Sequence, residues 1–256
     1  MLTPRRRRGH EYLDDPAIDG AIVVRSLHDV ARANTLFGGR RAVLRALDET
    51  LPALAGRGDE ATLLDVGTGM GDIPFHARRL AARRGLRLRT VGVELSEPLA
   101  RASRARVGHA VLADGFALPF ADGGVDVVTC SQLLHHFAEP DAERLLRELT
   151  RVACVRVIVG DLRRSWLAAG GFWLASWALR FHAVTRHDGV LSVLRGFTRD
   201  ELTALARAAG ADAPHVRHRL GWRVVASWAP VHVADVTPAL PRPSAGAPRR
   251  PAPVNA

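Results

Sequence analysis

The sequence predicts an α/β fold in which helices cover both faces of a mostly parallel sheet. Between residues 61 and 160, short apolar runs alternate with segments of helical periodicity, which is the pattern of repeated βαβ units. A turn containing three glycines follows the first apolar run, at residues 67–71. After residue 160 this alternation stops. Two adjacent strand-like runs near residue 221 then predict a hairpin at the end of the sheet.

The expected elements follow from this periodicity in chain order. Helices over 26–36 and 40–51, separated by Gly38 and Gly39, form a cap before the first strand. The core contains strand 61–66, helix 71–84, strand 88–94, helix 97–106, strands 109–113 and 125–130, helix 141–152 and strand 154–160. A last helix over 199–209 ends at Gly210, and strands 215–220 and 222–228 follow it.

Residues 163–197 form an insertion that is rich in large aromatic side chains, namely Trp166, Phe172, Trp173, Trp177 and Phe181. Its uncharged part, residues 165–179, is too short to span the hydrocarbon core of a bilayer. We therefore expect a buried helix or a lid over an apolar substrate, and no stable insertion into a membrane.

Composition divides the chain into one domain and two tails. Residues 1–15 are charged and lack periodicity, and residues 229–256 are rich in proline and alanine, so both ends are expected to be disordered. The domain spans 16–228, with the cap at 16–56, the core at 61–160, the insertion at 163–197 and the closing helix and hairpin at 198–228. With 47% hydrophobic residues in 256, the chain can bury one sizeable core.

The charge of the chain does not predict a nucleic-acid partner. The formal net charge is +10, and all 36 basic residues are arginine, but seven of these lie in the tails. No basic helix or aromatic–basic array occurs in the body of the chain. Cys130 and Cys154 lie in apolar runs, which argues against a disulfide framework, and Arg5–Arg8 precede no apolar export segment. We expect a cytoplasmic protein.

The glycine turn has the spacing G-x-G-x-G, at Gly67, Gly69 and Gly71, between an apolar strand and a helix. Glycine is required where the backbone takes positive φ or where a ligand lies against it. The spacing lacks the additional residue of the dinucleotide fingerprint G-x-G-x-x-G, which argues against a nicotinamide cofactor.

Three further motifs follow at the ends of expected strands. Glu94 ends the second strand, where a carboxylate can accept hydrogen bonds from both hydroxyls of a ribose. The segment 112–120 reads LADGFALPF and the segment 124–137 reads GVDVVTCSQLLHHF. Together with the glycine turn, these motifs resemble class I S-adenosylmethionine-dependent methyltransferases, of the ubiquinone-biosynthesis-like group and methyltransferase types 11 or 25. The resemblance covers roughly residues 61–160.

The resemblance implies a three-layer αβα sandwich around a seven-stranded sheet whose last strand is antiparallel, with S-adenosylmethionine as the cofactor. Its methionine portion would lie across the glycine turn, its ribose on Glu94, and its adenine on Asp114 and the backbone N–H of Gly115. The expected cofactor-binding residues are Asp65, Gly67, Thr68, Gly69, Gly71, Glu94, Leu95, Asp114, Gly115, Ser131 and Gln132.

Three histidines are candidates for a general base, because imidazole titrates near neutral pH. His135 and His136 are adjacent, so in an extended segment only one of them would face the pocket. His187 precedes Asp188 in the insertion, where a polar turn at Asp188-Gly189 is the simpler interpretation. No Cys/His cluster has metal-ligand spacing, so we expect no metal.

The sequence therefore predicts methyl transfer to a small, aromatic or apolar acceptor, with oxygen as the favoured acceptor atom and a role in secondary metabolism. Two alternatives stay open. One is a methyltransferase-like binding protein without turnover, and the other is a C-methyltransferase of quinone biosynthesis. The oligomeric state is not indicated by the sequence.

Overall fold

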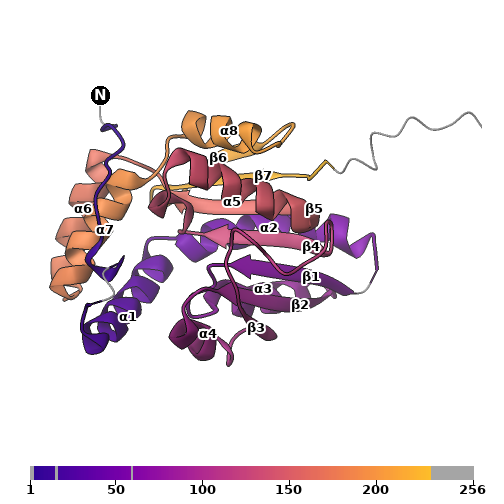
Figure 1. Cartoon of the computed structure of the whole chain (residues 1–256), viewed down its shortest axis with the longest axis horizontal. Coiled ribbons are helices and arrows are strands. Elements are labelled where there is room, and N and C mark those ends of the chain that lie inside the picture. Colours follow the sequence, from indigo (N-terminus) through magenta and orange to yellow (C-terminus); the bar gives the residue numbers. More distant parts are fainter. Residues whose placement is uncertain (1–2, 15–16, 59, 232–256) are drawn as a thin grey trace, which may run out of the picture.

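Seven strands form one sheet in the computed structural model, which describes residues 3–14, 17–58 and 60–231. The strands are β1 (Glu60–Val66), β2 (Arg87–Glu94), β3 (His109–Leu112), β4 (Val125–Ser131), β5 (Ala153–Leu162), β6 (His215–Arg219) and β7 (Arg223–Trp228). Their order in the sheet is β3-β2-β1-β4-β5-β7-β6. The pairs among β1 to β5 are parallel, and β7 is antiparallel to both of its neighbours. The predicted sheet is confirmed, including its antiparallel last strand (Figure 1).

Helices cover both faces of this sheet. Consecutive strand residues point to opposite sides, so the apolar strands need a covering layer on each face. On one face, Leu63 and Val127 pack with α2 (Gly39–Ala55) and α3 (Asp72–Ala82). On the other face, Leu64 and Val128 pack with α5 (Glu139–Val152) and α8 (Arg199–Ala208). The short helix α4 (Glu97–Ser103) connects β2 to β3. The sheet and the helical layer on each of its faces form the three-layer sandwich that the sequence predicts.

The cap helix α1 (Gly20–Leu36) begins six residues before its predicted start. Asp19 is its N-cap and accepts a hydrogen bond from the backbone N of Ala21, which satisfies a donor that the first turn of a helix leaves free. The helix continues to Phe37, and Gly38 takes a left-handed conformation before α2.

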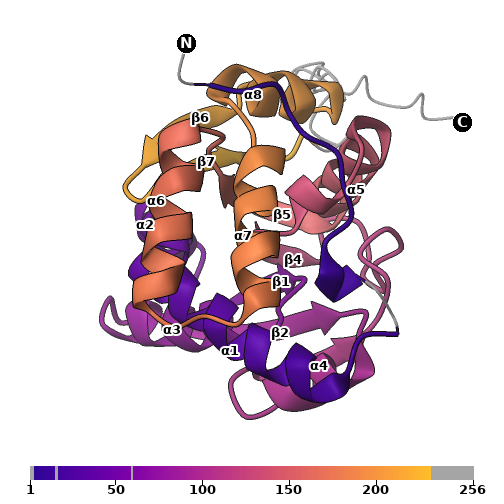
Figure 2. The ribbon, with the colours of Figure 1, turned by 90° about the vertical axis from the view of Figure 1, so that its left-hand side faces the viewer.

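The insertion forms two helices, α6 (Trp166–Ala178) and α7 (Ala183–Arg195), which pack against each other at the carboxyl edge of the sheet (Figures 1 and 2). Asp188 and Gly189 lie inside α7, so the predicted polar turn at these residues is wrong. A Cβ atom on Gly189 would lie 2.2 Å from the ring of Phe172, so glycine at this position allows the ring on α6 to pack against α7. Within the described residues, no helix has the length and apolar character needed to cross a bilayer.

The amino-terminal segment 3–14 runs along α7, which differs from the predicted disorder (Figure 2). The backbone N of Arg7 donates to Leu194 O at 3.1 Å. The backbone N–H groups of Tyr12 and Leu13 donate to the two carboxylate oxygens of Asp188 at 2.9 and 3.0 Å. The sequence of this segment is polar and lacks periodicity, which predicts disorder, but its backbone N–H groups have partners on α7. The predicted disorder of the other tail concerns mainly residues 232–256, which lie outside the described residues.

Candidate active site

The carboxyl ends of β1 and β2 bring the glycine turn and Glu94 to one edge of the sheet. Gly67 and Gly69 have φ angles of 68° and 52°, values that favour glycine. A Cβ atom on Gly67 would lie 2.7 Å from the side chain of Leu133, whereas no atom lies within 4 Å of the position of a Cβ atom on Gly69. The backbone at Gly69 therefore borders open space that a ligand could occupy.

Asp65 and Thr68 lie beneath this turn and stabilise it. The hydroxyl of Thr68 donates to Oδ2 of Asp65 at 2.8 Å, and the hydroxyl of Thr129 donates to Oδ1 at 2.7 Å. Burial raises the pKa of Asp65 to about 7, against the opposing effect of these two hydrogen bonds. Neither Asp65 nor Thr68 is among the residues that line the large cavity described below.

The carboxylate of Glu94 faces the glycine turn. Its Oε2 accepts a hydrogen bond from the backbone N of Gly69 at 2.9 Å, and its Oε1 accepts from Leu95 N at 3.0 Å and Ser96 N at 3.3 Å. These three donors fix the carboxylate at the edge of the cavity, which Glu94 helps to line. Oε1 already accepts two of these bonds, so Oε2 keeps the lone pair that is available to a ligand hydroxyl.

Asp114 and Gly115 follow β3, and Ser131 and Gln132 lie at the end of β4. Asp114 is exposed and accepts a hydrogen bond from the backbone N of Phe116 at 2.9 Å, so that its other carboxylate oxygen is available. Gln132 has φ 54°, an uncommon conformation for a residue with a side chain, and its backbone N donates to Gly160 O. Its amide lies close to Gly39 at the start of α2, where a Cβ atom would be 2.6 Å from Nε2.

A cavity of about 520 Å³ lies between this edge of the sheet, the cap and the insertion. Its walls are mainly apolar and include Leu27 and Val30 of α1, and Phe172 and Val193 of the insertion. Gly67, Glu94 and Gln132 form its inner side. The cavity therefore joins the glycine turn to an apolar chamber that the cap and the insertion enclose.

His135 is buried at the bottom of this chamber and forms a pair with Asp161, the acid near the end of β5. Its Nδ1 lies 2.7 Å from Oδ1 of Asp161, and its backbone N donates to Oδ2 at 3.1 Å. Burial opposes the ionisation of Asp161, but the charge and hydrogen bond of His135 and the backbone N–H of Leu162 outweigh it and lower the pKa of this carboxyl. An ionised Asp161 accepts a hydrogen bond from Nδ1–H, and in the neutral imidazole this leaves Nε2 of His135 as the acceptor.

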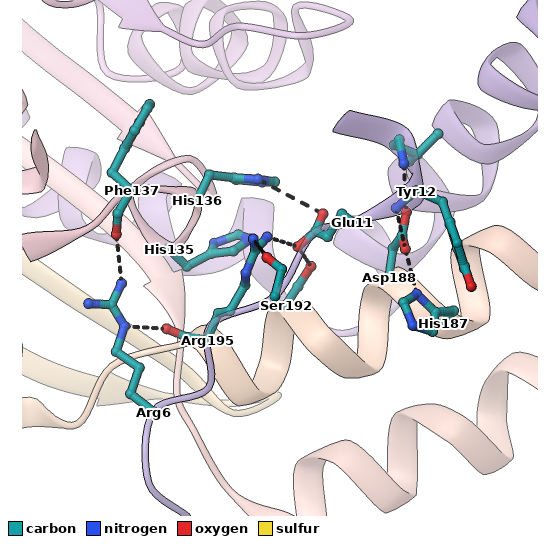
Figure 3. A network of polar contacts seen from close by, with 12 residues as sticks. Arg6, Glu11, Tyr12, His135, His136, Phe137, His187, Asp188, Ser192 and Arg195 are labelled. Carbon is teal, nitrogen blue, oxygen red and sulfur yellow. Dashed lines mark hydrogen bonds and ion pairs between the residues drawn. The ribbon is translucent and has the colours of Figure 1, made fainter. Parts of the chain in front are cut away.

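His136 lies beside His135 and faces Glu11 of the amino-terminal segment (Figure 3). The two imidazole rings are 4.3 Å apart, and Nδ1 of His136 lies 3.9 Å from Oε2 of Glu11. The other oxygen of Glu11 accepts hydrogen bonds from Nη1 of Arg195 at 2.8 Å and from the hydroxyl of Ser192 at 2.7 Å.

Both adjacent histidines line the cavity, so the prediction that only one of them faces it is wrong. The reason is local: residues 134–136 form a 3₁₀ turn, in which consecutive side chains do not point in opposite directions as they do in a strand. Among the described residues, Glu11, His135 and His136 each offer a metal-ligating atom within 4.8 Å of the others. Arg195 and Ser192 already engage Glu11. The absence of a resident metal stays a prediction.

His187 does not line this cavity. It lies on the outer side of α7, half exposed, with Nδ1 2.8 Å from Asp188 and its ring against Tyr12 (Figure 3). Asp188 contacts the neighbouring imidazole, and the same carboxylate holds the amino-terminal segment on the insertion. The structure therefore separates His187 from the other two candidate bases.

Arg223 is a buried cation in the cavity wall. Its Nη1 donates to Gly221 O at 3.1 Å, whereas its buried Nε has no hydrogen-bond partner among the described residues. Burial lowers the pKa of Arg223 to about 10, against the opposing charge of Asp161. A buried donor without a partner is costly for the folded protein.

Sequence reasoning missed Glu11, Asp161, Arg195 and Arg223. Asp161 had a detectable signal, since it lies near the carboxyl end of a strand next to the one that precedes His135. Glu11 and Arg195 had none, because their contact joins residues 184 positions apart. Arg223 occupies a strand position, where the sequence alone does not distinguish a buried arginine from an exposed one.

The segment that contains most of strands β1 to β5 is similar to known proteins. Residues 64–156 match a methyltransferase domain family, Methyltransf_11. A methyltransferase from Mycobacterium sp. strain JLS, otherwise uncharacterised, is 41% identical over 108 residues. This alignment covers 42% of the present chain and 38% of that relative. The alignment therefore spans well under half of the length of the relative.

Solved structures share the fold over a longer part of the chain. A SAM-dependent methyltransferase from Thermotoga maritima superimposes with a TM-score of 0.53 at 20% identity, covering 82% of this chain and 99% of that one. The CMeT domain of the citrinin polyketide synthase gives a TM-score of 0.53 at 13% identity, over 73% of this chain and 52% of that one. At these identities the likeness concerns the fold alone.

Proposed function

We propose that this chain, whose residues 64–156 match a methyltransferase domain family, transfers a methyl group from S-adenosylmethionine to an oxygen of a small aromatic acceptor. The proposal includes a phenolic hydroxyl as the acceptor group and secondary metabolism as the setting. Cys130 and Cys154 are both free, which supports a reducing, cytoplasmic location.

The residues at the carboxyl edge of the sheet fit S-adenosylmethionine. The open space beside Gly69 suits the methionine portion, and the fixed carboxylate of Glu94 suits the ribose hydroxyls. The available oxygen of Asp114 suits an exocyclic amino group. When bound, the cofactor supplies a sulfonium-activated methyl group, so that the chain must mainly align the acceptor and manage its proton.

The chamber beyond the glycine turn supports a small aromatic acceptor. Its apolar walls from α1, α6 and α7 favour a flat hydrocarbon ring, and its volume of about 520 Å³ suits a small molecule. His135, His136 and Arg223 are among the polar residues that line it. These side chains would hold the hydroxyl of an aromatic ring whose apolar part packs on the walls.

His135 is the proposed general base for this hydroxyl. Because Asp161 holds the proton on Nδ1, the lone pair of Nε2 is available to accept the proton of the phenol. The guanidinium of Arg223, which lines the cavity, would then stabilise the oxygen as it becomes negative. The buried His135–Asp161 pair in a chamber next to the glycine turn is the observation that carries the proposal.

The direct test uses S-adenosylmethionine labelled with ¹³C at the methyl group and a panel of phenols, with the corresponding anilines and toluenes as controls. We expect labelled methyl ethers from phenols, recognised by the methoxy ¹³C resonance and by product mass. Labelled ring-methyl products would instead favour the quinone-type C-methyltransferase. Tight binding of S-adenosylhomocysteine in calorimetry with no turnover of any acceptor would favour a binding protein.

A further inference from the structure

The outer face of α6 is an exposed apolar stripe. Trp166, Leu167, Trp173, Leu174 and Trp177 are between 47% and 65% exposed. Their spacing of one, six, one and three residues places them on one side of a helix, together with Gly170. Of the two predicted alternatives, a buried helix or a lid, the first is therefore wrong for this face, whereas the opposite face of α6 contacts α7 and the cavity. Figure 2 shows α6 at the surface beside α7.

Basic side chains border this stripe. The guanidinium of Arg7 lies 5.5 Å from the centre of the Trp166 ring, and that of Arg186 lies 3.9 Å from the centre of the Trp177 ring. Both arginines also line a groove of about 400 Å³ with Trp173, between the amino-terminal segment and the insertion. No acidic residue is among those lining it.

The acidic residues nearest to the groove are not available to balance this charge. Asp188 of α7 is buried and accepts hydrogen bonds from the amino-terminal segment, and Glu11 is buried and paired with Arg195. The surface around the stripe thus combines tryptophan, leucine and uncompensated positive charge. A second copy of this chain on the same face would bring like charges together, whereas an anionic surface would complement them.

We propose that the outer face of α6 docks on an anionic lipid bilayer. At 13 residues α6 is too short to span the membrane, so it would lie in the plane of the interface. The three tryptophan rings would occupy the headgroup level, which this side chain favours, and Leu167 and Leu174 would enter the acyl region. Arg7 and Arg186 would contact lipid phosphates from the groove beside Trp173.

This docking would connect the bilayer to the acceptor cavity. Ala168, Gly171 and Phe172 of the same helix line the cavity on its inner face. α6 is therefore the layer between the proposed lipid surface and the chamber, and an apolar acceptor dissolved in the membrane would reach the chamber beside it. Only this consequence rests on the proposed methyl transfer; the docking itself does not.

The test is co-sedimentation of the full chain with vesicles of phosphatidylcholine, with and without phosphatidylserine. We expect binding to the vesicles that contain phosphatidylserine, weakened by salt, with a blue shift of tryptophan fluorescence. Trp173→Gln/Trp177→Gln should weaken binding at least about tenfold. Arg7→Ala/Arg186→Ala should weaken it by roughly fivefold for each arginine.

Matched controls separate this surface from general effects of charge and hydrophobicity. Arg83→Ala/Arg104→Ala removes the same charge from exposed positions at the ends of α3 and α4, and Val231→Gln replaces an exposed apolar residue beyond β7. Both should bind as the unchanged protein does. Equal weakening by the controls, or no vesicle binding by a folded protein, would overturn the proposal. So would a dimer in light scattering that the tryptophan variant dissociates.

Discussion

The imidazole of His135 and the carboxylate of Asp161 form a buried pair with a separation of 2.7 Å between Nδ1 and Oδ1. The second carboxylate oxygen accepts the backbone N–H of the same histidine. Asp161 therefore fixes both the position and the tautomer of His135, and it connects the loop after β4 to the end of β5. A positioning role of this kind has measurable consequences.

Asp161→Asn should lower kcat for a phenolic acceptor by about a hundredfold, with little change in KM for S-adenosylmethionine. The amide allows the wrong tautomer of His135, so the acidic limb of the pH–rate profile should move as well. Steady-state kinetics across pH would measure both effects.

The His187–Asp188 pair is the matched control. His187→Gln removes an imidazole that also lies next to an aspartate, but outside the cavity. It should leave kcat nearly unchanged, whereas His135→Gln should reproduce the loss. Equal losses in both variants would show that neither imidazole acts as the base.

Asp65 should make the stability of the protein depend on pH. Its pKa in the folded state, about 7, lies above that of an unfolded chain, about 4. The folded protein therefore holds this proton between those values, and the resulting stability is full below pH 4 and lost as the pH rises through 7. We expect the free energy of unfolding to fall by up to about 1.4 kcal/mol per pH unit over this range.

Asp65→Asn removes the titrating group and should remove this slope, while its carbonyl oxygen can still accept one of the two threonine hydroxyl bonds. Urea unfolding of both proteins at several pH values between 5 and 8 measures the difference. Parallel pH profiles for the two proteins would contradict the raised pKa.

Asp114→Ala should weaken binding of S-adenosylhomocysteine about tenfold, because one hydrogen bond to the adenine amino group is lost. Isothermal titration calorimetry would measure the affinity. Asp212→Ala is a suitable control, since Asp212 is also exposed but lies in the loop after α8. The adenine assignment fails if the two variants bind the ligand equally well.

Arg223→Met should make the protein more stable and less active. The substitution removes a buried guanidinium whose Nε lacks a partner, and an apolar side chain of similar length fills the space. The melting temperature should rise, while kcat for a phenol should fall. A lower melting temperature, with unchanged kcat, would indicate that Arg223 only supports the fold.

Most of the core can be predicted from the sequence, because the hydrophobic pattern and the turn residues determine the elements there. The apolar strands and the glycines at 67, 69 and 71 specify β1 to β5 and the edge at which Glu94 lies, since hydrophobic period and turn chemistry act over a few residues. The site is less predictable. Glu11 meets Arg195 through tertiary packing alone, and the 3₁₀ turn that brings His135 and His136 together has no periodicity to detect it.

The cavity wall is formed by residues from two separate parts of the sequence. Gly67, Glu94 and Gln132 come from the segment that matches the methyltransferase family, whereas Glu11, Val30, Phe172 and Val193 come from segments outside it. On the proposed function, the residues that hold the donor therefore lie in the matching segment, and much of the apolar wall around the acceptor lies outside it. Exchange of the outer segments would then change which acceptors fit the chamber, while the donor site stays the same.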